Sequence, residues 1–180
     1  GTHAVGLMLE VLDCLERGDA VHVPVFSKAI DDRLTTSRLI PAADIIIVEG
    51  WCWGARPQSL EQLEHPVNDL EKVTDPAGEW RGFVNAQLAS DYAQLFRSDV
   101  TIFLQVPSIE SVINWRWQQE QQLTDNPPAE GQVDRKMTSV EEVAVFVAYY
   151  ERLTRWMLHD IPEHADLTLL DGKTVAIIGY

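Results

Sequence analysis

The run Asp44-Ile45-Ile46-Ile47-Val48-Glu49-Gly50 decides the predicted fold of this chain. Four consecutive apolar, β-branched residues lie between two acids, and a glycine ends the run. A continuous apolar run of this length is typical of a parallel strand, because helices cover both faces of such a strand. We therefore predict a buried strand over residues 44–49 inside an α/β sheet.

Predicted helices and strands alternate on both sides of this run. Before it, helical spacing of apolar residues predicts a helix over 5–18, and a short strand over 20–26 precedes a polar loop over 27–37. After it, we predict helices over 60–70, interrupted at Pro66, and over 80–96, 108–123 and 138–159, and strands over 100–106, 167–170 and 174–178, the last two joined by a turn at Asp171-Gly172. The pattern predicts one α/β domain over residues 1–180, with a parallel sheet covered by helices.

Charge and composition argue against several classes of partner. The 180 residues carry 14 Lys and Arg against 28 Asp and Glu, a net charge of −14. Nucleic acids and anionic membranes are bound by clustered basic residues, which the sequence lacks, so we expect neither as a partner. The longest apolar run is far shorter than the roughly 20 residues of a membrane helix. Cys14 and Cys52 have no metal-ligand spacing, and we interpret them as reduced thiols of a cytoplasmic protein.

Three strand ends are predicted to meet at one edge of the sheet. Ligands of open α/β sheets bind beyond the carboxyl ends of the strands. Those ends are followed here by Ser27-Lys28, by Glu49-Gly50-Trp51 and by Pro107-Ser108. An acid placed like Glu49 can hold Mg²⁺ or its waters in a nucleotide phosphotransferase. The residues alone leave a second interpretation open, in which Glu49 caps the strand or forms a structural salt bridge.

Five stretches along the chain resemble one family of enzymes. They are Phe26 to Arg33, Glu49 to Pro57, Val84-Asn85 with Leu88 and Tyr92, Trp115 to Glu120, and Met137-Thr138-Ser139 with Glu141 to Val143. In this order they resemble the glycerate-kinase-like P-loop kinases, which belong to the group of uridine kinase, phosphoribulokinase and pantothenate kinase. The resemblance implies a P-loop kinase-like fold and phosphorylation of a small hydroxylated metabolite with ATP and Mg²⁺. D-glycerate or a similar hydroxy acid is the first candidate substrate.

The resemblance also implies roles for single residues. Glu49 becomes the catalytic acid close to Mg²⁺, and Arg116 with Gln119 becomes the contact to the phosphates of ATP. The implied acceptor-binding residues are Lys28, Asp32, Arg33, Asn85 and Tyr92. Cations among them suit a carboxylate-bearing acceptor. Simpler alternatives stay open: a solvated loop for Lys28, a surface arginine for Arg116, and packing for Asn85 and Tyr92.

A lid is expected between two of the predicted helices. The stretch Thr124 to Lys136 contains two prolines, one glycine and five charged residues, which predicts a mobile loop inside the domain. The resemblance makes this loop part of a lid over about residues 116–137 that closes and excludes water.

The sequence offers no suitable phosphate-binding loop. The motif G-x-x-x-x-G-K-[ST] cradles phosphates with backbone N–H groups between a strand and a helix. The only Gly-Lys-Thr is Gly172-Lys173-Thr174, Leu167 stands at the position of the required first glycine, and we interpret the segment as a hairpin turn. In the family the loop lies upstream of the stretch that resembles Gly1-Thr2-His3. We therefore expect a fold that is incomplete at the N-terminus and a chain that is inactive alone.

Two further expectations follow from the missing loop. A sheet without its P-loop strand exposes apolar edges, so we expect a second copy or a separate N-terminal segment to complete it. The alternative function is a non-catalytic, kinase-like binding or interaction protein that has lost the phosphate-binding loop. Ala4 and Ser27 stand where family members often carry Asp, which leaves the identity of the acceptor open.

Overall fold

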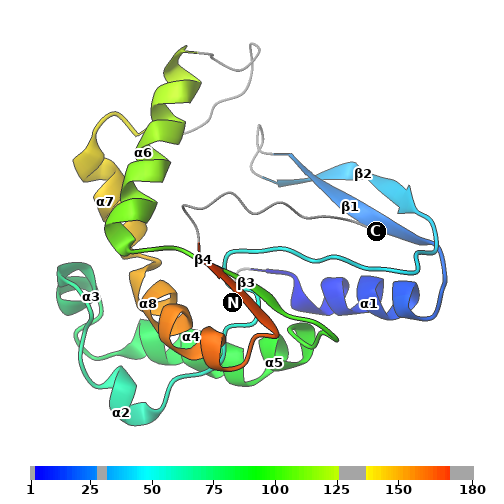
Figure 1. Cartoon of the computed structure of the whole chain (residues 1–180), viewed down its shortest axis with the longest axis horizontal. Coiled ribbons are helices and arrows are strands. Elements are labelled where there is room, and N and C mark those ends of the chain that lie inside the picture. Colours follow the sequence, from blue (N-terminus) through cyan, green and yellow to red (C-terminus); the bar gives the residue numbers. More distant parts are fainter. Residues whose placement is uncertain (1–2, 28–31, 126–136, 171–180) are drawn as a thin grey trace.

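A computed structural model describes residues 3–27, 32–125 and 137–170, and Figure 1 shows a mixture of helices and strands. The elements in chain order are α1 Val5–Glu16, β1 Val21–Ser27, β2 Asp32–Ile40, α2 Leu60–Leu63, α3 Asp69–Thr74, α4 Glu79–Ala89, α5 Asp91–Leu95, β3 Ile102–Gln105, α6 Ile109–Asp125, α7 Val140–Ala148, α8 Glu151–Asp160, the 3₁₀ turn η1 Ile161–Glu163 and β4 Leu167–Leu170. The predicted α/β class is confirmed.

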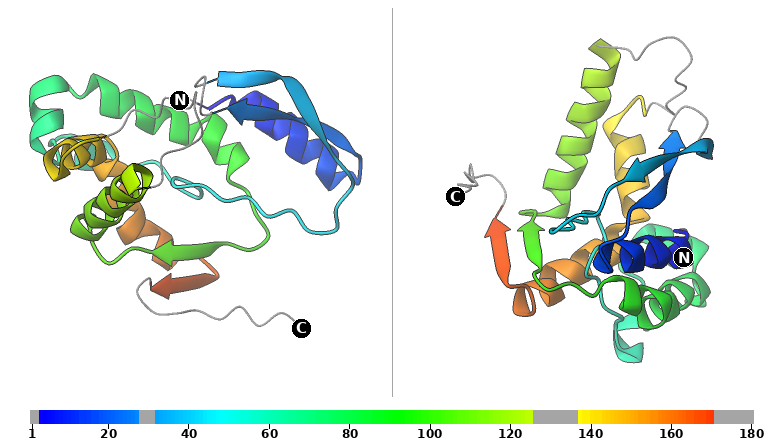
Figure 2. Two further views of the ribbon diagram at one scale, coloured as in Figure 1. Left: turned by 90° about the horizontal axis from the view of Figure 1, so that it is seen from above. Right: turned by 90° about the vertical axis from the view of Figure 1, so that its right-hand side faces the viewer.

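The strands form two separate pairs in the described part of the chain. β3 and β4 run parallel, and Ile102 lies opposite Leu167. β1 and β2 form an antiparallel hairpin, in which Val21 lies opposite Ile40. Figure 2 shows the hairpin beside α1, away from β3 and β4, with the chain between β2 and α2 running between the two pairs. A small parallel sheet is thus present, and within the described residues it consists of β3 and β4.

The run Asp44 to Glu49 is not a strand, and that prediction is wrong for this structure. The run is irregular, and Ile45 and Ile47 are 77% and 87% exposed. A strand forms only where a neighbouring strand accepts and donates its backbone hydrogen bonds. Neither of the two described pairs includes residues 44–49. The apolar run therefore has the composition of a buried strand, but no partner strand among the residues that the structure describes.

The predicted polar loop over 27–37 is also corrected. Its second half belongs to β2, which pairs with β1 up to the contact of Ser27 with Asp32. Nearly every residue of β2 is exposed, so no alternation of apolar and polar residues marked it as a strand. The predicted strand over 174–178 and its turn lie outside the described residues.

Two predicted helices are broken. The helix over 80–96 is divided into α4 and α5 at Ser90, whose φ and ψ are −110° and −98°. The helix over 138–159 is divided into α7 and α8, because Tyr149 and Tyr150 donate backbone bonds to residues three positions earlier. The predicted interruption at Pro66 is confirmed, since α2 ends before it and α3 begins after it.

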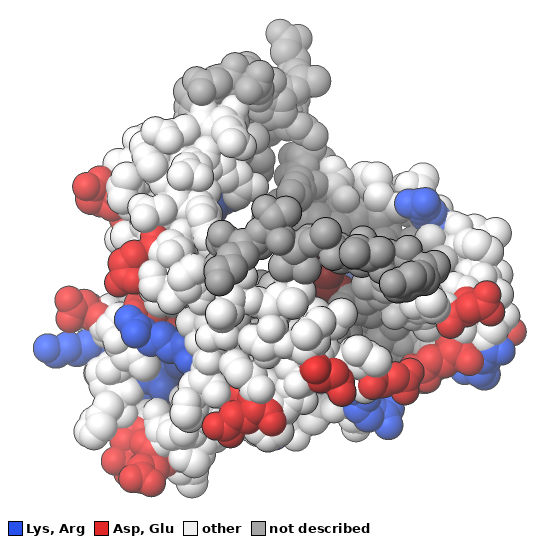
Figure 3. Space-filling model, in the orientation of Figure 1, with Lys and Arg blue, Asp and Glu red and all other residues white. Residues whose placement is uncertain are grey.

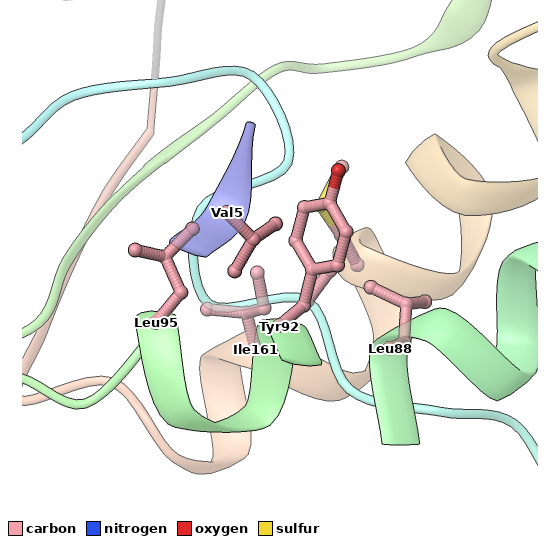
Figure 4. Packing of buried hydrophobic residues seen from close by; sticks show 7 residues of the cluster. Val5, Leu88, Tyr92, Leu95 and Ile161 are labelled. Atoms are coloured by element: carbon pink, nitrogen blue, oxygen red, sulfur yellow. The ribbon is translucent and has the colours of Figure 1, made fainter. Parts of the chain in front are cut away.

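Buried apolar side chains gather where α1, α4, α5, α8 and η1 meet. Figure 4 shows Val5, Leu88, Tyr92, Leu95 and Ile161 packed against one another. Ala55 and Met157 complete this cluster, which joins α1 to α8. A smaller cluster of Ile109, Val143 and Val147 joins α6 to α7. The helices therefore supply the main support for the loops between them.

Candidate functional site

The loop over residues 50–57, which follows Glu49, is fixed to α8. The indole Nε1 of Trp51 donates to Thr154 Oγ1 at 3.1 Å, and Nε1 of Trp156 donates to the carbonyl oxygen of Arg56 at 2.8 Å. Gly54 has a φ of +80°, a conformation that glycine adopts without steric cost. The loop that leads away from Glu49 thus has a defined shape.

An arginine–aspartate ion pair also holds the loop 50–57 against α8. Arg56 donates from Nε and Nη2 to the two carboxylate oxygens of Asp160, at 2.8 and 2.5 Å. The hydrogen bonds from Arg56 lower the pKa of the Asp160 carboxyl below its ordinary value, although burial opposes this shift. His164 lies beside the pair, with Nδ1 3.0 Å from Arg56 Nη2. Because the pair joins residues far apart in sequence, it fixes the loop to the helical core.

Glu49 itself is exposed at the start of this loop. Within the described residues, its carboxylate forms no hydrogen bond or ion pair. The alternative of a structural salt bridge therefore finds no support in the described part of the chain. An exposed carboxylate beside a fixed loop can take a ligand from solution.

The hairpin holds the charged residues predicted to bind the acceptor. Asp32 and Arg33 are exposed at the start of β2, and Asp32 Oδ1 accepts from the backbone N–H of Arg33 at 2.7 Å. Lys28 lies outside the described residues. Asp32 and Arg33 are therefore adjacent and accessible, which is compatible with binding a small polar ligand.

Asn85 and Tyr92 are engaged with other parts of the protein. Asn85 Oδ1 accepts from the backbone N–H of Gln58 at 2.6 Å, and its Nδ2 donates to the carbonyl of Gln58 at 3.0 Å. Tyr92 is only 4% exposed, and its hydroxyl oxygen lies 2.8 Å from Nδ1 of His3. Burial raises the pKa of the Tyr92 hydroxyl. These contacts agree with the packing interpretation left open for both residues.

Arg116 and Gln119 lie together, as their spacing on a helix predicts. Arg116 Nη1 donates to Gln119 Oε1 at 2.5 Å. The guanidinium of Arg116 also lies over the ring of Phe146, 5.6 Å from its centroid. Among the described residues, no hydrogen bond or ion pair connects Arg116 or Gln119 with Glu49, Asp32 or Arg33. The structure thus brings together the two residues predicted to contact ATP, Arg116 and Gln119.

Glu120 is a further residue of this group to which the sequence assigned no role. Its Oε1 lies 2.5 Å from Arg116 Nη2, and its Oε2 accepts from the backbone N–H of Met137 at 3.1 Å. The sequence did contain an indication, because arginine and glutamate four positions apart lie on one face of a helix. A buried carboxylate is therefore part of the arginine's immediate surroundings.

A hollow of about 330 Å³ lies near the amino ends of the two parallel strands, β3 and β4. Thr101 and Ala165, which line it, precede β3 and β4, whereas the predicted site lies beyond the carboxyl ends of the strands. Other lining residues are Arg56, Leu88, Phe96, Asp160, Ile161 and His164. None of the predicted site residues that the structure describes contributes to this hollow.

The fold is similar to that of a D-glycerate 3-kinase. That enzyme, from Cryptococcus neoformans var. grubii, matches 87% of this chain with a TM-score of 0.69 and 20% sequence identity. The chain spans 56% of the length of that enzyme. No family model matches the sequence, and no curated protein matches it either. The likeness supports the kinase-like fold and leaves the activity to be argued from the residues.

Neither a cluster of metal-binding side chains nor a membrane-spanning helix occurs among the described residues. No group of three or more His, Cys, Asp or Glu side chains within residues 3–27, 32–125 and 137–170 could hold a metal. Mg²⁺ is often held by one or two carboxylates together with the phosphates of a substrate, so Glu49 alone is compatible with it. None of the described helices is long and apolar enough to cross a bilayer.

Charged side chains are scattered over the face shown in Figure 3. Acidic side chains follow one another in the region of α1, whereas Lys and Arg occur as separate spots. A nucleic-acid site would need a continuous basic surface. This face of the molecule has none among the residues that Figure 3 colours.

Proposed function

We propose that this chain is part of an ATP-dependent kinase that phosphorylates a small hydroxylated metabolite, D-glycerate or a similar hydroxy acid. The observation that carries the proposal is the fold match to a D-glycerate 3-kinase over 87% of the chain. The motifs in the sequence support the same assignment from independent grounds, because they occur in the same order as in that family of kinases.

Arg116 is the group best suited to the phosphates of ATP. Phosphoryl transfer depends on positioning and on fixed positive charge near the transferred group. The contacts of Arg116 with Gln119, Glu120 and Phe146 hold a guanidinium in one orientation. Such a group stabilises the negative charge that spreads over the phosphoryl oxygens in the transition state.

Glu49 is the proposed acid close to Mg²⁺. Its carboxylate is exposed and precedes a loop that α8 holds in place. When bound, Mg²⁺ neutralises charge on the phosphates of ATP. The role of Glu49 is then to hold the ion or its waters at a fixed place.

The acceptor is proposed to bind beside the β1–β2 hairpin. Arg33 and Lys28 would pair with the carboxylate of a hydroxy acid, and Asp32 would orient a hydroxyl group as a hydrogen-bond acceptor. Asn85 and Tyr92 would contribute indirectly, since Tyr92 is buried and their polar groups contact Gln58 and His3. We assign the reaction to the cytoplasm, where ATP is available and where Cys14 and Cys52 would stay reduced.

A further segment of polypeptide is proposed to complete the sheet and to supply the phosphate-binding loop. The chain spans 56% of the kinase whose fold it shares. Large apolar side chains are exposed on the run 44–49 and on β3, among them Ile45, Ile47, Ile102 and Leu104. An exposed apolar strand such as β3 favours addition of another strand, and the run 44–49 has the composition to form one. A separate N-terminal segment or a second copy of the chain would bury these side chains.

The proposal is tested with the natural polypeptide that contains this sequence. Mg-ATP and D-glycerate are added, and phosphorylated product is followed by phosphorus NMR. Arg116→Gln should lower kcat about 100-fold or more, because one preorganised charge is lost. Arg155→Gln is the matched control, since Arg155 also pairs with a glutamate four residues from it, 2.6 Å away. Absence of product with every hydroxy acid tried would reject the kinase.

The second candidate is a non-catalytic binding protein. It is favoured by one observation, that the only Gly-Lys-Thr, at residues 172–174, lacks the preceding glycine of a phosphate-binding loop. This candidate predicts that D-glycerate binds to the natural polypeptide, as measured by calorimetry, without any transfer from ATP. Binding that disappears in Arg33→Gln, with no phosphorylated product in the wild type, would support it over the kinase.

A further inference from the structure

Glu120 on α6 is the most deeply buried charged residue in the described part of the chain, with 1% of its surface exposed. A carboxylate buried to this extent is costly unless ion pairs and hydrogen bonds compensate it. Among the contacts that do so are those with Arg116 Nη2 at 2.5 Å and with the backbone N–H of Met137 at 3.1 Å. Because these contacts come from different segments, the carboxylate has little freedom to move.

Arg116 is only partly buried, and its side chain is 30% exposed. Gln119, Glu120 and the ring of Phe146 contact its guanidinium. Its Nε is buried and has no hydrogen-bond partner among the described residues. The guanidinium is therefore fixed by its neighbours while part of the side chain still faces solvent. A guanidinium has five N–H donors, so donors remain for a ligand.

We infer that Glu120 is the positioning residue for Arg116, holding its guanidinium so that the remaining donors meet phosphate oxygens. This inference rests on the proposed function. Glu120 does not increase the attraction of an anion, because its charge opposes that of Arg116. Its contribution is orientation, since an arginine that already has its bound conformation loses less side-chain entropy when a phosphate binds.

A second glutamate provides a matched comparison on another helix. Glu151 on α8 pairs with Arg155 at 2.6 Å with the same spacing of four residues. It also accepts from Nδ2 of Asn68 at 2.9 Å, so both glutamates join their helix to another segment. Arg155 carries no proposed role. Loss of Glu151 should therefore cost stability alone.

The test compares Glu120→Gln with Glu151→Gln in the natural polypeptide. The probe is inorganic tripolyphosphate, and its dissociation constant is measured by calorimetry below the thermal midpoint of each variant. Glu120→Gln should weaken binding about tenfold, because the guanidinium loses its fixed orientation. Glu151→Gln should leave binding unchanged. Equal affinity in the wild type and Glu120→Gln would overturn the inference.

A double variant separates positioning from a structural role. In an Arg116→Gln background, Glu120→Gln should have no further effect on tripolyphosphate binding, because there is no guanidinium left to orient. If Glu120→Gln weakens binding equally in both backgrounds, Glu120 acts only by joining Met137 to α6. That result would also overturn the inference.

A spectroscopic readout keeps the test independent of the kinase activity. The guanidinium carbon of Arg116 lies over the Phe146 ring, and the Nε bonded to it is shielded from water. The Nε–H group should give a ring-current-shifted nitrogen–proton NMR signal that exchanges slowly in the wild type and is lost in Glu120→Gln. An unchanged signal in the variant would contradict the inference. Failure of the proposed function would appear differently, as absence of phosphoryl transfer by the wild type.

Discussion

The helical part of the molecule and its strand-forming part use apolar residues in opposite ways. Leu88, Leu95 and Met157 are buried between α1, α4, α5 and α8, whereas Ile45, Ile47 and Leu104 are exposed. A helix satisfies its own backbone hydrogen bonds and needs neighbours only to bury its apolar face. A strand needs neighbours both for its backbone hydrogen bonds and for the burial of its apolar side chains. The difference teaches that the described residues bury a helical core but leave apolar side chains of β3 and of the run 44–49 exposed.

Removal of a buried arginine should damage the helical part most. Arg81 is 5% exposed and donates to the carbonyls of Leu63, Glu64 and Asp75, besides pairing with the Asp75 carboxylate at 3.2 Å. Arg81→Met would leave these acceptors without a partner, and we expect a loss of about 3–5 kcal/mol in urea unfolding. Arg17→Met, at an exposed site, should change nothing measurable. A loss below about 1 kcal/mol would show that the α2–α4 region is held by other contacts.

A pair of truncations compares the two parts directly. Leu88→Ala should lower the free energy of unfolding by about 2–4 kcal/mol, because it opens a cavity in the core. Ile47→Ala should change it by less than about 0.5 kcal/mol, since the side chain is 87% exposed. Chemical denaturation of both variants checks the contrast. Similar losses at the two sites would mean that residues 44–49 are buried in solution, for example by a completed sheet.

Acid should weaken the attachment of the loop 50–57 to α8. The pKa of the Asp160 carboxyl is lowered, mainly by the hydrogen bonds from Arg56. The contribution of this ion pair to the free energy of unfolding is therefore fully present above pH 3.8, the ordinary pKa, and is lost as the pH falls through the lower pKa of the folded state. Arg56 is half exposed, and we expect only about 1 kcal/mol at pH 7. Asp160→Asn should therefore destabilise at pH 7 and have a smaller effect near pH 2, measured by urea unfolding. Asp19→Asn, at an exposed pair, is the control; an equal effect of Asp160→Asn at both pH values would contradict the ion pair.

The smallest effect is expected at a helix start. The hydroxyl oxygen of Ser139 accepts from the backbone N–H of Glu142 at 3.2 Å and caps α7. Ser139→Ala should cost about 0.5–1 kcal/mol in urea unfolding. Ser37→Ala on the exposed hairpin should cost less than half as much. The opposite order would mean that the hairpin contributes more to stability than its exposure indicates.

The sequence predicted those elements that carry a clear local pattern. The periodic helices α1 and α6, the strand β1 and the break at Pro66 follow from local spacing or from backbone chemistry. The breaks at Ser90 and Tyr149 carry no glycine or proline, so no local pattern marked them. β2 is exposed on both faces and lacks a pattern for the same reason. The prediction of a strand over residues 44–49 was wrong because strand formation depends on a neighbouring strand and not on composition alone.

In the candidate site, too, contacts between residues close in sequence could be predicted and contacts between distant residues could not. Arg116 and Gln119 are three residues apart on one helix, and their contact is a direct consequence of that spacing. The partners of Asn85 and Tyr92 are Gln58 and His3, which are 27 and 89 residues away in sequence. No spacing rule reaches that far. The hydrogen bonds that occupy these two side chains could be found only from the folded chain.

The attachment of Arg56 to Asp160 has a consequence for the order of events during biosynthesis. These residues are 104 positions apart. At a translation rate of about 5–20 residues per second, roughly 5–20 seconds separate their synthesis on the ribosome. During that interval the loop after Glu49 has none of its contacts with α8, and the apolar run before it is already made. The loop can therefore take its final shape only after α8 has emerged, although the residues that form it are made long before.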